Sequence, residues 1–155
     1  MPQVTKGGKF IFGWSRIREG GILTLPPQAV SEYDIVCEGR VILFTGSKST
    51  GGFCVTRHGL WMRSKLGFVL AQTPAVSEYA DAPYTWRRIK GRSYCWAPVT
   101  NMGELALPSE TLTFLNMKPN DLLLSIRSSD IAFTMGHHGP LVERARNYAG
   151  TIGIY

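Results

Sequence analysis

Short stretches of alternating apolar and polar residues run through the chain, and they occur in two similar series. Each series opens with a stretch that ends at Leu-Pro, WSRIREGGILTLP over 14–26 and WAPVTNMGELALP over 96–108. At an offset of 82, without gaps, five of these thirteen positions are identical, and most of the others are similar in type. Such alternation is typical of half-buried strands. The pattern therefore indicates that the chain repeats a strand-rich unit.

A short helix is predicted after each Leu-Pro. Proline forces the residue before it into extended geometry and is well tolerated as the first helical residue. The stretch PQAVSEY places Val30 and Tyr33 on one helical face, and SETLTFL does the same with Leu112 and Leu115. Each Leu-Pro therefore marks the point where a strand ends and a helix begins.

A β-hairpin and a final helix are predicted after each short helix. The first hairpin joins RVILFT (40–45) to FCVT (53–56) through GSKSTGG. The second joins DLLLSI (121–126) to IAFTM (131–135) through RSSD. Both hairpins end on Phe, four residues, His and Gly, at an offset that is now 80. The closing helical patterns are LWMRSKLGF and LVERARNYA.

This order of elements predicts a mainly β fold with short helices. The first repeat covers 1–68, a connector covers 69–91, and the second repeat covers 92–155. At 155 residues the chain can bury one good core, but it is too short for two large domains. A half with four short strands has exposed edges and little core of its own. We therefore expect the halves to close one β-barrel together as an intramolecular pseudo-dimer.

The stretches GILTLPPQAV and GELALPSETL, with KPNDLLLSI as the turn into a later strand, resemble the AbrB, MazE and SpoVT group of swapped-hairpin domains. The resemblance covers roughly residues 10–56 and 92–136, and the tandem arrangement is similar to that of MraZ. It implies a swapped-hairpin (double-split) β-barrel made from two paired units. It also implies a DNA-binding transcription regulator, because members are typically bacterial or archaeal regulators, or antitoxins that bind their own operators.

Charge indicates where double-stranded DNA would bind. The chain has 17 Lys and Arg against 11 Asp and Glu, and up to Leu66 nine of these cations accompany four acids. Basic side chains neutralise phosphates and release counterions. The candidate DNA-binding residues lie on the predicted first strands or just before the second one: Lys9, Arg16, Arg18, Arg87, Arg88, Lys90 and Arg92. If the two repeats pair about a twofold axis, these charges gather on one face.

The alternative is a non-DNA binding module, in which the same barrel holds a small molecule or a protein partner. Operator binders of this group usually carry Arg after the shared Gly, where this chain has Ile22 and Glu104. Their short helices also tend to carry basic residues, which PQAVSEY and SETLTFL lack. The glycines of GSKSTGG have the spacing of a phosphate-binding loop, but Gly52 stands where that loop needs Lys, and Phe53 stands where it needs Ser or Thr. We therefore interpret the loop as a hairpin turn. Its Lys48 could still contact a ligand or a DNA backbone.

The histidines and two tryptophans are expected to have structural roles. His58, His137 and His138 have no acid or cysteine cluster beside them, and we expect structural or helix-entry positions rather than a metal site. Trp14 and Trp96 have apolar neighbours, which favours the barrel core over base stacking.

The remaining expectations concern chemistry and location. Cys37, Cys54 and Cys95 lack CxxC spacing and are expected to be reduced and buried. No recognised catalytic motif occurs, so we expect neither an enzyme nor a cofactor. The chain lacks a long apolar span and an apolar leader, so it is expected to be cytoplasmic, with no membrane contact. A homo-oligomer could form through a free sheet edge or through LGFVLA over 66–71.

Overall fold

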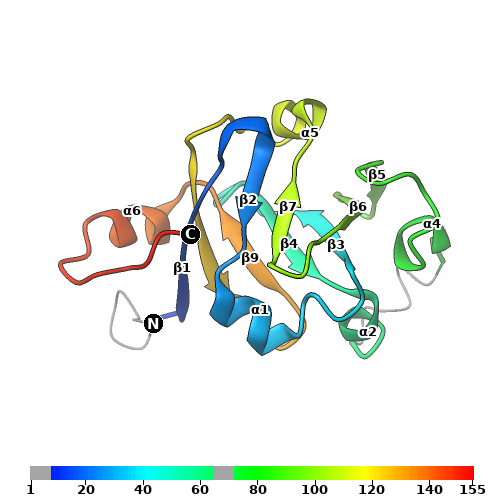
Figure 1. Cartoon of the computed structure of the whole chain (residues 1–155), viewed down its shortest axis with the longest axis horizontal. Helices are drawn as coiled ribbons and strands as arrows, with labels where there is room; N and C mark the ends of the chain where they lie inside the picture. The colour runs from blue at the N-terminus through cyan, green and yellow to red at the C-terminus, as the bar shows by residue number, and fades with distance from the viewer. Residues whose placement is uncertain (1–7, 65–71) are drawn as a thin grey trace.

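A computed structural model describes residues 8–64 and 72–155, which form a mainly β structure with short helices (Figure 1). The predicted fold class is confirmed at this level. The strands are β1 (Ile11–Arg16), β2 (Ile22–Thr24), β3 (Arg40–Thr45), β4 (Phe53–Thr56), β5 (Arg87–Ile89), β6 (Arg92–Pro98), β7 (Glu104–Ala106), β8 (Leu122–Arg127) and β9 (Phe133–Gly136). The helices are the 3-10 turn η1 (Glu19–Gly21), α1 (Pro27–Tyr33), α2 (His58–Trp61), α4 (Pro74–Ser77), α5 (Ser109–Phe114) and α6 (Pro140–Arg146).

The elements follow the two predicted series closely. The strands β3 and β4 occupy the predicted stretches 40–45 and 53–56, and GSKSTGG connects them as a hairpin. The connector adds structure that the sequence pattern did not indicate, namely α4 and β5, which pairs with β6. The turn between β5 and β6 holds Lys90 at a φ of 48° and Gly91 at 87°, as a tight two-residue hairpin requires.

Seven strands form one antiparallel sheet in the order β1-β8-β9-β4-β3-β6-β5, and β2 pairs with β7 in a second sheet. In the large sheet β1 pairs with β8, β3 with β6, and β4 with β9. Each of these pairs joins a strand from the first part of the chain to one from the second part. Figure 1 shows β2 and β7 crossing in front of the large sheet.

Two of these strand pairs place equivalent positions of the repeat opposite one another. In the β4–β9 pair Cys54 faces Thr134, its equivalent at the offset of 80. In the β2–β7 pair Leu23 faces Leu105, its equivalent at the offset of 82. The neighbouring positions cross over, so that Phe53 faces Met135 while Val55 faces Phe133. In both strand pairs, the residue pairing is therefore symmetric about the central pair of equivalent positions.

The shared glycine of the repeat, Gly21 or Gly103, allows β2 and β7 to meet. Each has a φ of 76°, where an L side chain is strained. The Gly103 carbonyl accepts from the N–H of Leu25 at 2.9 Å, and the Gly21 carbonyl accepts from the N–H of Leu107 at 3.0 Å. A Cβ on Gly21 would lie 2.0 Å from the Leu107 carbonyl oxygen. At Gly21 the glycine is therefore required by the close approach of the Leu107 backbone, whereas at Gly103 the nearest atom is in the Val30 side chain.

The main core lies between the two sheets and under α1 and α5. Alternate residues of every long strand point into it, including Leu43, Val55 and Phe133, and they meet Leu23 and Leu105 from the small sheet. All five are at most 1% exposed. The core therefore draws on both halves, and neither half encloses it alone.

The opposite face of the large sheet carries two smaller apolar clusters, one on each flank. On one flank α2 and α4 contribute Trp61 and Val76, which cover Phe44 and Tyr94. On the other flank α6 contributes Val142 and Ala145, which cover Ile11, Trp14, Leu124 and Ile126. The helices thus cover the two flanks of the outer face with side chains from both ends of the chain.

The expected core position holds for Trp14, which is buried in an apolar cluster, but not for Trp96, which is only partly buried. Trp14 is buried, but on the outer face beneath α6, because a register irregularity around Gly13 shifts the alternation of β1. Trp96 lies between Cys95 and Ala97, which point into the main core, so its own side chain points outward. It is partly buried, and its indole N–H donates to the Asp81 carbonyl at 2.8 Å.

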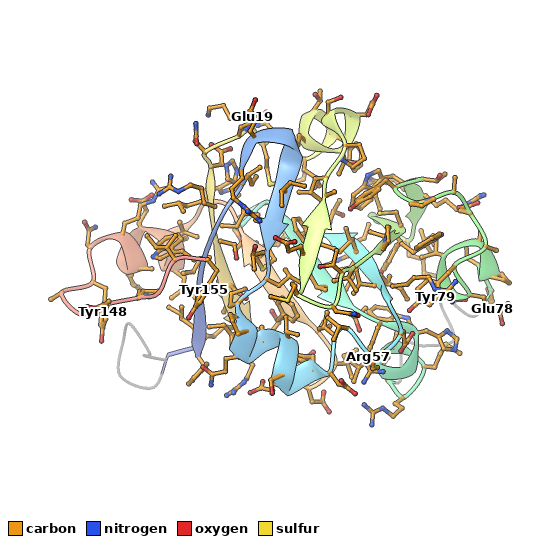
Figure 2. All side chains as sticks on the ribbon, viewed as in Figure 1. Glu19, Arg57, Glu78, Tyr79, Tyr148 and Tyr155 are labelled. Carbon is orange, nitrogen blue, oxygen red and sulfur yellow. The ribbon has the colours of Figure 1, made fainter. Side chains whose placement is uncertain are left out.

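The outer edge of β1 is covered by the last residues of the chain. The N–H of Trp14 donates to the Gly153 carbonyl at 2.8 Å, and the N–H of Arg16 donates to the Tyr155 carbonyl at 2.9 Å. The N–H of Tyr155 in turn donates to the Trp14 carbonyl at 2.8 Å. Figure 2 shows Tyr155 beside β1. This segment occupies backbone groups that an edge strand otherwise leaves open to another chain.

The cysteines are free thiols, and one of them is not buried as predicted. Cys54 and Cys95 are buried, whereas Cys37 is exposed. Cys37 lies in the turn that follows α1, where the chain leaves the core before β3. Burial raises the pKa of Cys95, which keeps this thiol neutral.

Part of the sequence with an expected role lies outside the described residues. The helix predicted over 60–68 begins as α2 at His58 and ends at Trp61, and its last four residues are not described. The segment 66–71, proposed above for self-association, also falls there. In the part of the chain that the structure describes, no helix has the length and apolar character to cross a membrane.

Replacing Gly21 by Ala tests the close contact between β2 and β7. Gly39→Ala is the matched control, because Gly39 has a similar φ of 69° but a Cβ there would meet nothing within 4 Å. Both variants carry the backbone strain of about 1–2 kcal/mol, and Gly21→Ala adds the displacement of the Leu107 backbone. We expect urea unfolding to show Gly21→Ala as the less stable variant by roughly 2 kcal/mol. If the two variants lost the same free energy of unfolding, the close contact at Gly21 would be contradicted.

Candidate functional site

The seven basic residues that the sequence predicts as DNA contacts fall into three groups. One group lies at or after the end of β1, a second lies on β5 and its turn, and a third lines a cavity on the outer face of the large sheet. β1 and β5 are the two opposite ends of the strand order, so the structure does not gather all seven in one place. The groups are Arg16 and Arg18; Arg87, Arg88 and Lys90; and Lys9 and Arg92.

Two of these cations are already paired with carboxylates. Arg18 donates to Glu104 at 2.7 Å. Arg87 forms two hydrogen bonds to Asp81, of 2.6 and 2.8 Å, and the pKa of Asp81 is lowered chiefly by these bonds. Exposed ion pairs of this kind contribute little to stability, so a phosphate could replace either carboxylate at small cost.

The first two groups flank α5. The η1 turn, which follows Arg18, contacts α5 on one side. On the other side Phe114 of α5 stacks on Trp86, just before β5, with ring centroids 4.9 Å apart. Figure 1 shows the β1–β2 turn and α5 together at the top of the molecule with β5 beside them, and Figure 2 shows Glu19 at this end.

A cavity of about 780 Å³ lies on the outer face of the large sheet. It is in the middle of that face, where Cys54 and Thr134 sit opposite each other on β4 and β9. Trp61 of α2 and Leu141 of α6 belong to its lining. The cavity therefore lies in the gap between the two flanking helices, and side chains from both halves line it.

Three cations line this cavity, namely Lys9, Arg92 and Arg144. Arg92 donates to the Thr45 carbonyl at 3.2 Å, and its guanidinium carbon lies 5.7 Å from the centroid of the Phe44 ring. All three cations are exposed, and the described lining contains no Asp or Glu. The cavity therefore has a positive potential that attracts anions.

The deeper part of the cavity is aromatic. Phe44 lies 5.4 Å from Trp61 and 5.6 Å from Tyr94 between ring centroids, and the three rings are at most 8% exposed. The buried indole N–H of Trp61 has no acceptor among the described residues. A buried donor without a partner costs free energy, and an acceptor atom supplied from outside would remove that cost.

Hydroxyl groups surround the cavity near the two hairpin loops. The Ser47 hydroxyl is 3.0 Å from that of Thr50, and Ser128 is hydrogen-bonded to Thr134. Cys54 lies 3.4 Å from the Thr134 hydroxyl. Burial raises the pKa of Cys54, although Thr134 and the charge of Arg92 act in the opposite direction. The thiol is therefore neutral and is a poor nucleophile at neutral pH.

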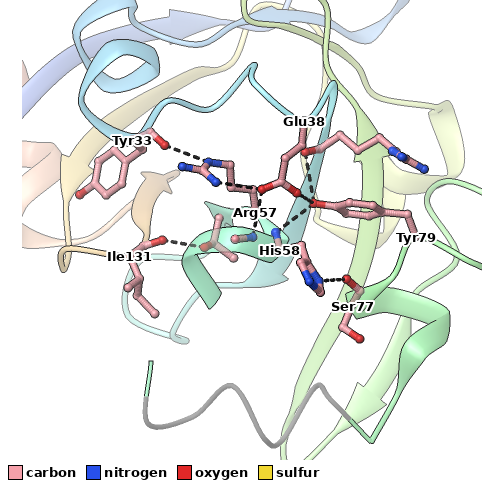
Figure 3. A network of polar contacts seen from close by, with 10 residues as sticks. Tyr33, Glu38, Arg57, His58, Ser77, Tyr79 and Ile131 are labelled. Carbon is pink, nitrogen blue, oxygen red and sulfur yellow. Dashed lines mark hydrogen bonds and ion pairs between the residues drawn. The ribbon is translucent and has the colours of Figure 1, made fainter. Parts of the chain in front are cut away.

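A polar network fixes α2, and thereby Trp61, at one side of the cavity (Figure 3). Glu38 accepts hydrogen bonds from the Arg57 guanidinium at 2.9 Å, from the Gly59 N–H at 3.0 Å and from the Tyr79 hydroxyl at 2.6 Å. The Tyr79 hydroxyl accepts from the N–H of His58 at 2.9 Å. These bonds join the first residues of α2 to the turn before β3 and to the connector.

Two of the three histidines occupy structural positions, as the sequence predicts, whereas His138 is exposed. His58 begins α2, and its Nδ1 donates to the Ser77 carbonyl at 2.5 Å. His137 contacts Asp121 through Nε2 at 3.0 Å. Across residues 8–64 and 72–155, no group of three or more His, Cys, Asp or Glu side chains could hold a metal ion.

Sequence reasoning missed Arg144 and Trp61 as cavity residues. Both lie on helices whose apolar positions were recognised, but the sequence does not show what the outer face of the sheet places opposite them. The sequence did contain one signal for Arg144. The helical spacing of Val142 and Ala145 fixes the face of α6 that packs on the sheet, and Arg144 lies at the margin of that face.

These features define a class of protein: a mainly β chain of two interleaved strand series with a cationic cavity on the outer face of its large sheet. No protein-family model matches the sequence, and a search of curated proteins finds no match.

The network at Glu38 predicts a pH-dependent stability. Burial alone would raise the pKa of Glu38, but the hydrogen bonds from Tyr79, Arg57 and Gly59 outweigh it and lower the pKa below its ordinary value of 4.5. The stabilisation is therefore complete above that value and is lost as the pH falls through the lower pKa of the folded state. We expect Glu38→Gln to cost about 1–3 kcal/mol at pH 7.

Urea unfolding at pH 7 and at pH 3 measures this effect. The difference between the wild-type protein and Glu38→Gln should narrow at pH 3, because that pH lies below the ordinary pKa of 4.5 and the unfolded chain then binds a proton at Glu38 that the folded chain resists. Glu78→Gln, which changes an exposed carboxylate next to Tyr79, should alter stability by less than about 0.5 kcal/mol at either pH. A difference that stays constant with pH would show that the charge of Glu38 is not what stabilises α2.

Proposed function

We propose that the chain is a DNA-binding transcription regulator of the AbrB and SpoVT type, built from two fused repeats that close a swapped-hairpin barrel. The observation that carries the proposal is the register of the β4–β9 and β2–β7 pairs, in which Cys54 faces Thr134 and Leu23 faces Leu105. Equivalent positions meet in this way only across a twofold axis. A dimer interface of that kind, contained in one chain, is what the tandem resemblance implies.

Two further observations support the interleaving of the repeats. The first strand of each repeat pairs with a hairpin strand of the other, because β1 lies beside β8 and β6 lies beside β3. The reciprocal hydrogen bonds at Gly21 and Gly103 repeat the same relationship at the small sheet. These pairings account for why the motif GxLxLP occurs twice, since each copy provides the backbone that the other copy approaches.

The proposed DNA surface is the end of the molecule that carries η1 and α5. Arg16 and Arg18 lie on one side of α5, and the group on β5 and its turn lies on the other side. Binding would exchange the carboxylate partners of Arg18 and Arg87 for phosphates, which accept the single hydrogen bond that Arg18 makes and the bidentate pair that Arg87 makes. Because the short helices lack basic residues, specificity would depend largely on DNA shape. Lys9 and Arg92 line the cavity and do not belong to this surface.

Fluorescence anisotropy with duplex DNA at several salt concentrations tests this function. We expect binding that weakens steeply with salt, and the double variant Arg16→Ala/Arg18→Ala should make the slope of log K against log salt shallower by about 2. The control Arg144→Ala/Arg146→Ala removes the same charge from α6 and should leave the slope unchanged. No binding at low salt, or equal effects of the two variants, would remove the proposal.

A further inference from the structure

We propose that the cavity on the outer face of the large sheet binds a small amphipathic anion, an organic acid or phosphate ester with an aromatic or branched apolar body. This inference goes beyond DNA binding and does not depend on it. It is carried by the combination, in one cavity, of an aromatic interior, three cations and no described carboxylate. Lys9, Arg92 and Arg144 would hold the acid group, and Phe44, Trp61 and Tyr94 would hold the body.

The size of the cavity suits such a molecule. Its volume of about 780 Å³ is in the range of sites that enclose a small organic ligand. The rings of Phe44, Trp61 and Tyr94 are already packed against one another at 5.4 to 6.0 Å between centroids. An apolar ligand body would therefore meet a preformed surface rather than one that must reorganise.

The polar groups around the cavity favour an anion over a neutral or cationic ligand. Arg92 is held in place by the Thr45 carbonyl and by the ring of Phe44, so its free guanidinium hydrogens are already oriented. Hydroxyls of Ser47, Thr50 and Ser128 can donate to the same acid group. A cation would meet three like charges, and a neutral molecule would gain nothing from them.

The unpartnered indole N–H of Trp61 adds an independent observation. It is buried beside the cavity and has no acceptor in the described part of the chain. Because this nitrogen is itself buried, a ligand oxygen would reach it only after a shift of the ring. The three aromatic rings are at most 8% exposed, which favours a small molecule over a DNA backbone as the occupant.

The test uses two fluorescent probes that differ by one charged group. 8-Anilinonaphthalene-1-sulfonate has an aromatic body and an anionic group, and N-phenyl-1-naphthylamine has the same rings without the sulfonate. We expect the wild-type protein to bind the sulfonate at least about tenfold more tightly than the neutral probe. Arg92→Gln/Arg144→Gln should weaken the sulfonate about five- to tenfold, the loss expected for two partly exposed ion pairs, and leave the neutral probe unchanged.

Matched variants keep the interpretation specific. Lys118→Gln/Arg146→Gln removes two exposed cations that do not line the cavity and should not change the binding of either probe. Thr134→Phe fills the cavity floor and should abolish the binding of both probes, with far-UV circular dichroism as the check on folding. Ser128→Trp obstructs the exposed rim and serves the same purpose if Thr134→Phe does not fold.

Several outcomes would overturn the proposal. They are equal affinity for the two probes, an equal effect of the two double variants, or binding that survives when the cavity is filled. Displacement of the sulfonate by duplex DNA would assign these cations to the nucleic-acid surface instead. Conversely, a protein that binds the sulfonate in the cavity but does not bind DNA would retain this inference and lose the regulator.

Discussion

The backbone hydrogen bonds between strands distant in the sequence are the constraint on which the rest of this structure depends. β3 has its hairpin partner β4 on one side, but its other edge is completed by β6 from the second half of the chain. β8 is completed by β1 in the same way. A half alone would leave these edges and the apolar residues above them exposed to water. The main core therefore requires strands from both halves.

The same pairing creates the cavity. Once the inner face of the large sheet is committed to the core, its outer face still carries apolar side chains that need cover. The helices α2, α4 and α6 cover the flanks, but they lie on either side of the middle of the sheet. Cys54 and Thr134 lie at that middle, where the two halves meet. The cavity is thus the region of the outer face that neither half covers by itself.

The sequence predicted what depends on local pattern and missed what depends on a single shift or on distant contacts. Leu-Pro and the alternation of RVILFT and FCVT located α1, β3 and β4 to the residue. The register irregularity at Gly13 places the Trp14 side chain on the outer face of the large sheet instead of the inner face, and no pattern in the sequence indicates this shift. The basic residues could be identified from the sequence. Only the fold shows that Arg16 lies at the end of β1 near η1, whereas Arg92 lines a cavity together with Arg144.

The two strand series follow a similar order of elements, but they present different side chains to the cavity. Trp61 and Leu141 are equivalent at the offset of 80 and both line the cavity, so its apolar walls follow the repeat. The cations do not, since Arg144 is equivalent to Ser64 and Arg92, at the offset of 82, is equivalent to Phe10. Two identical chains would give a cavity on their axis two identical walls. A fused chain can differ at the two walls, and it therefore can hold an asymmetric ligand in one orientation.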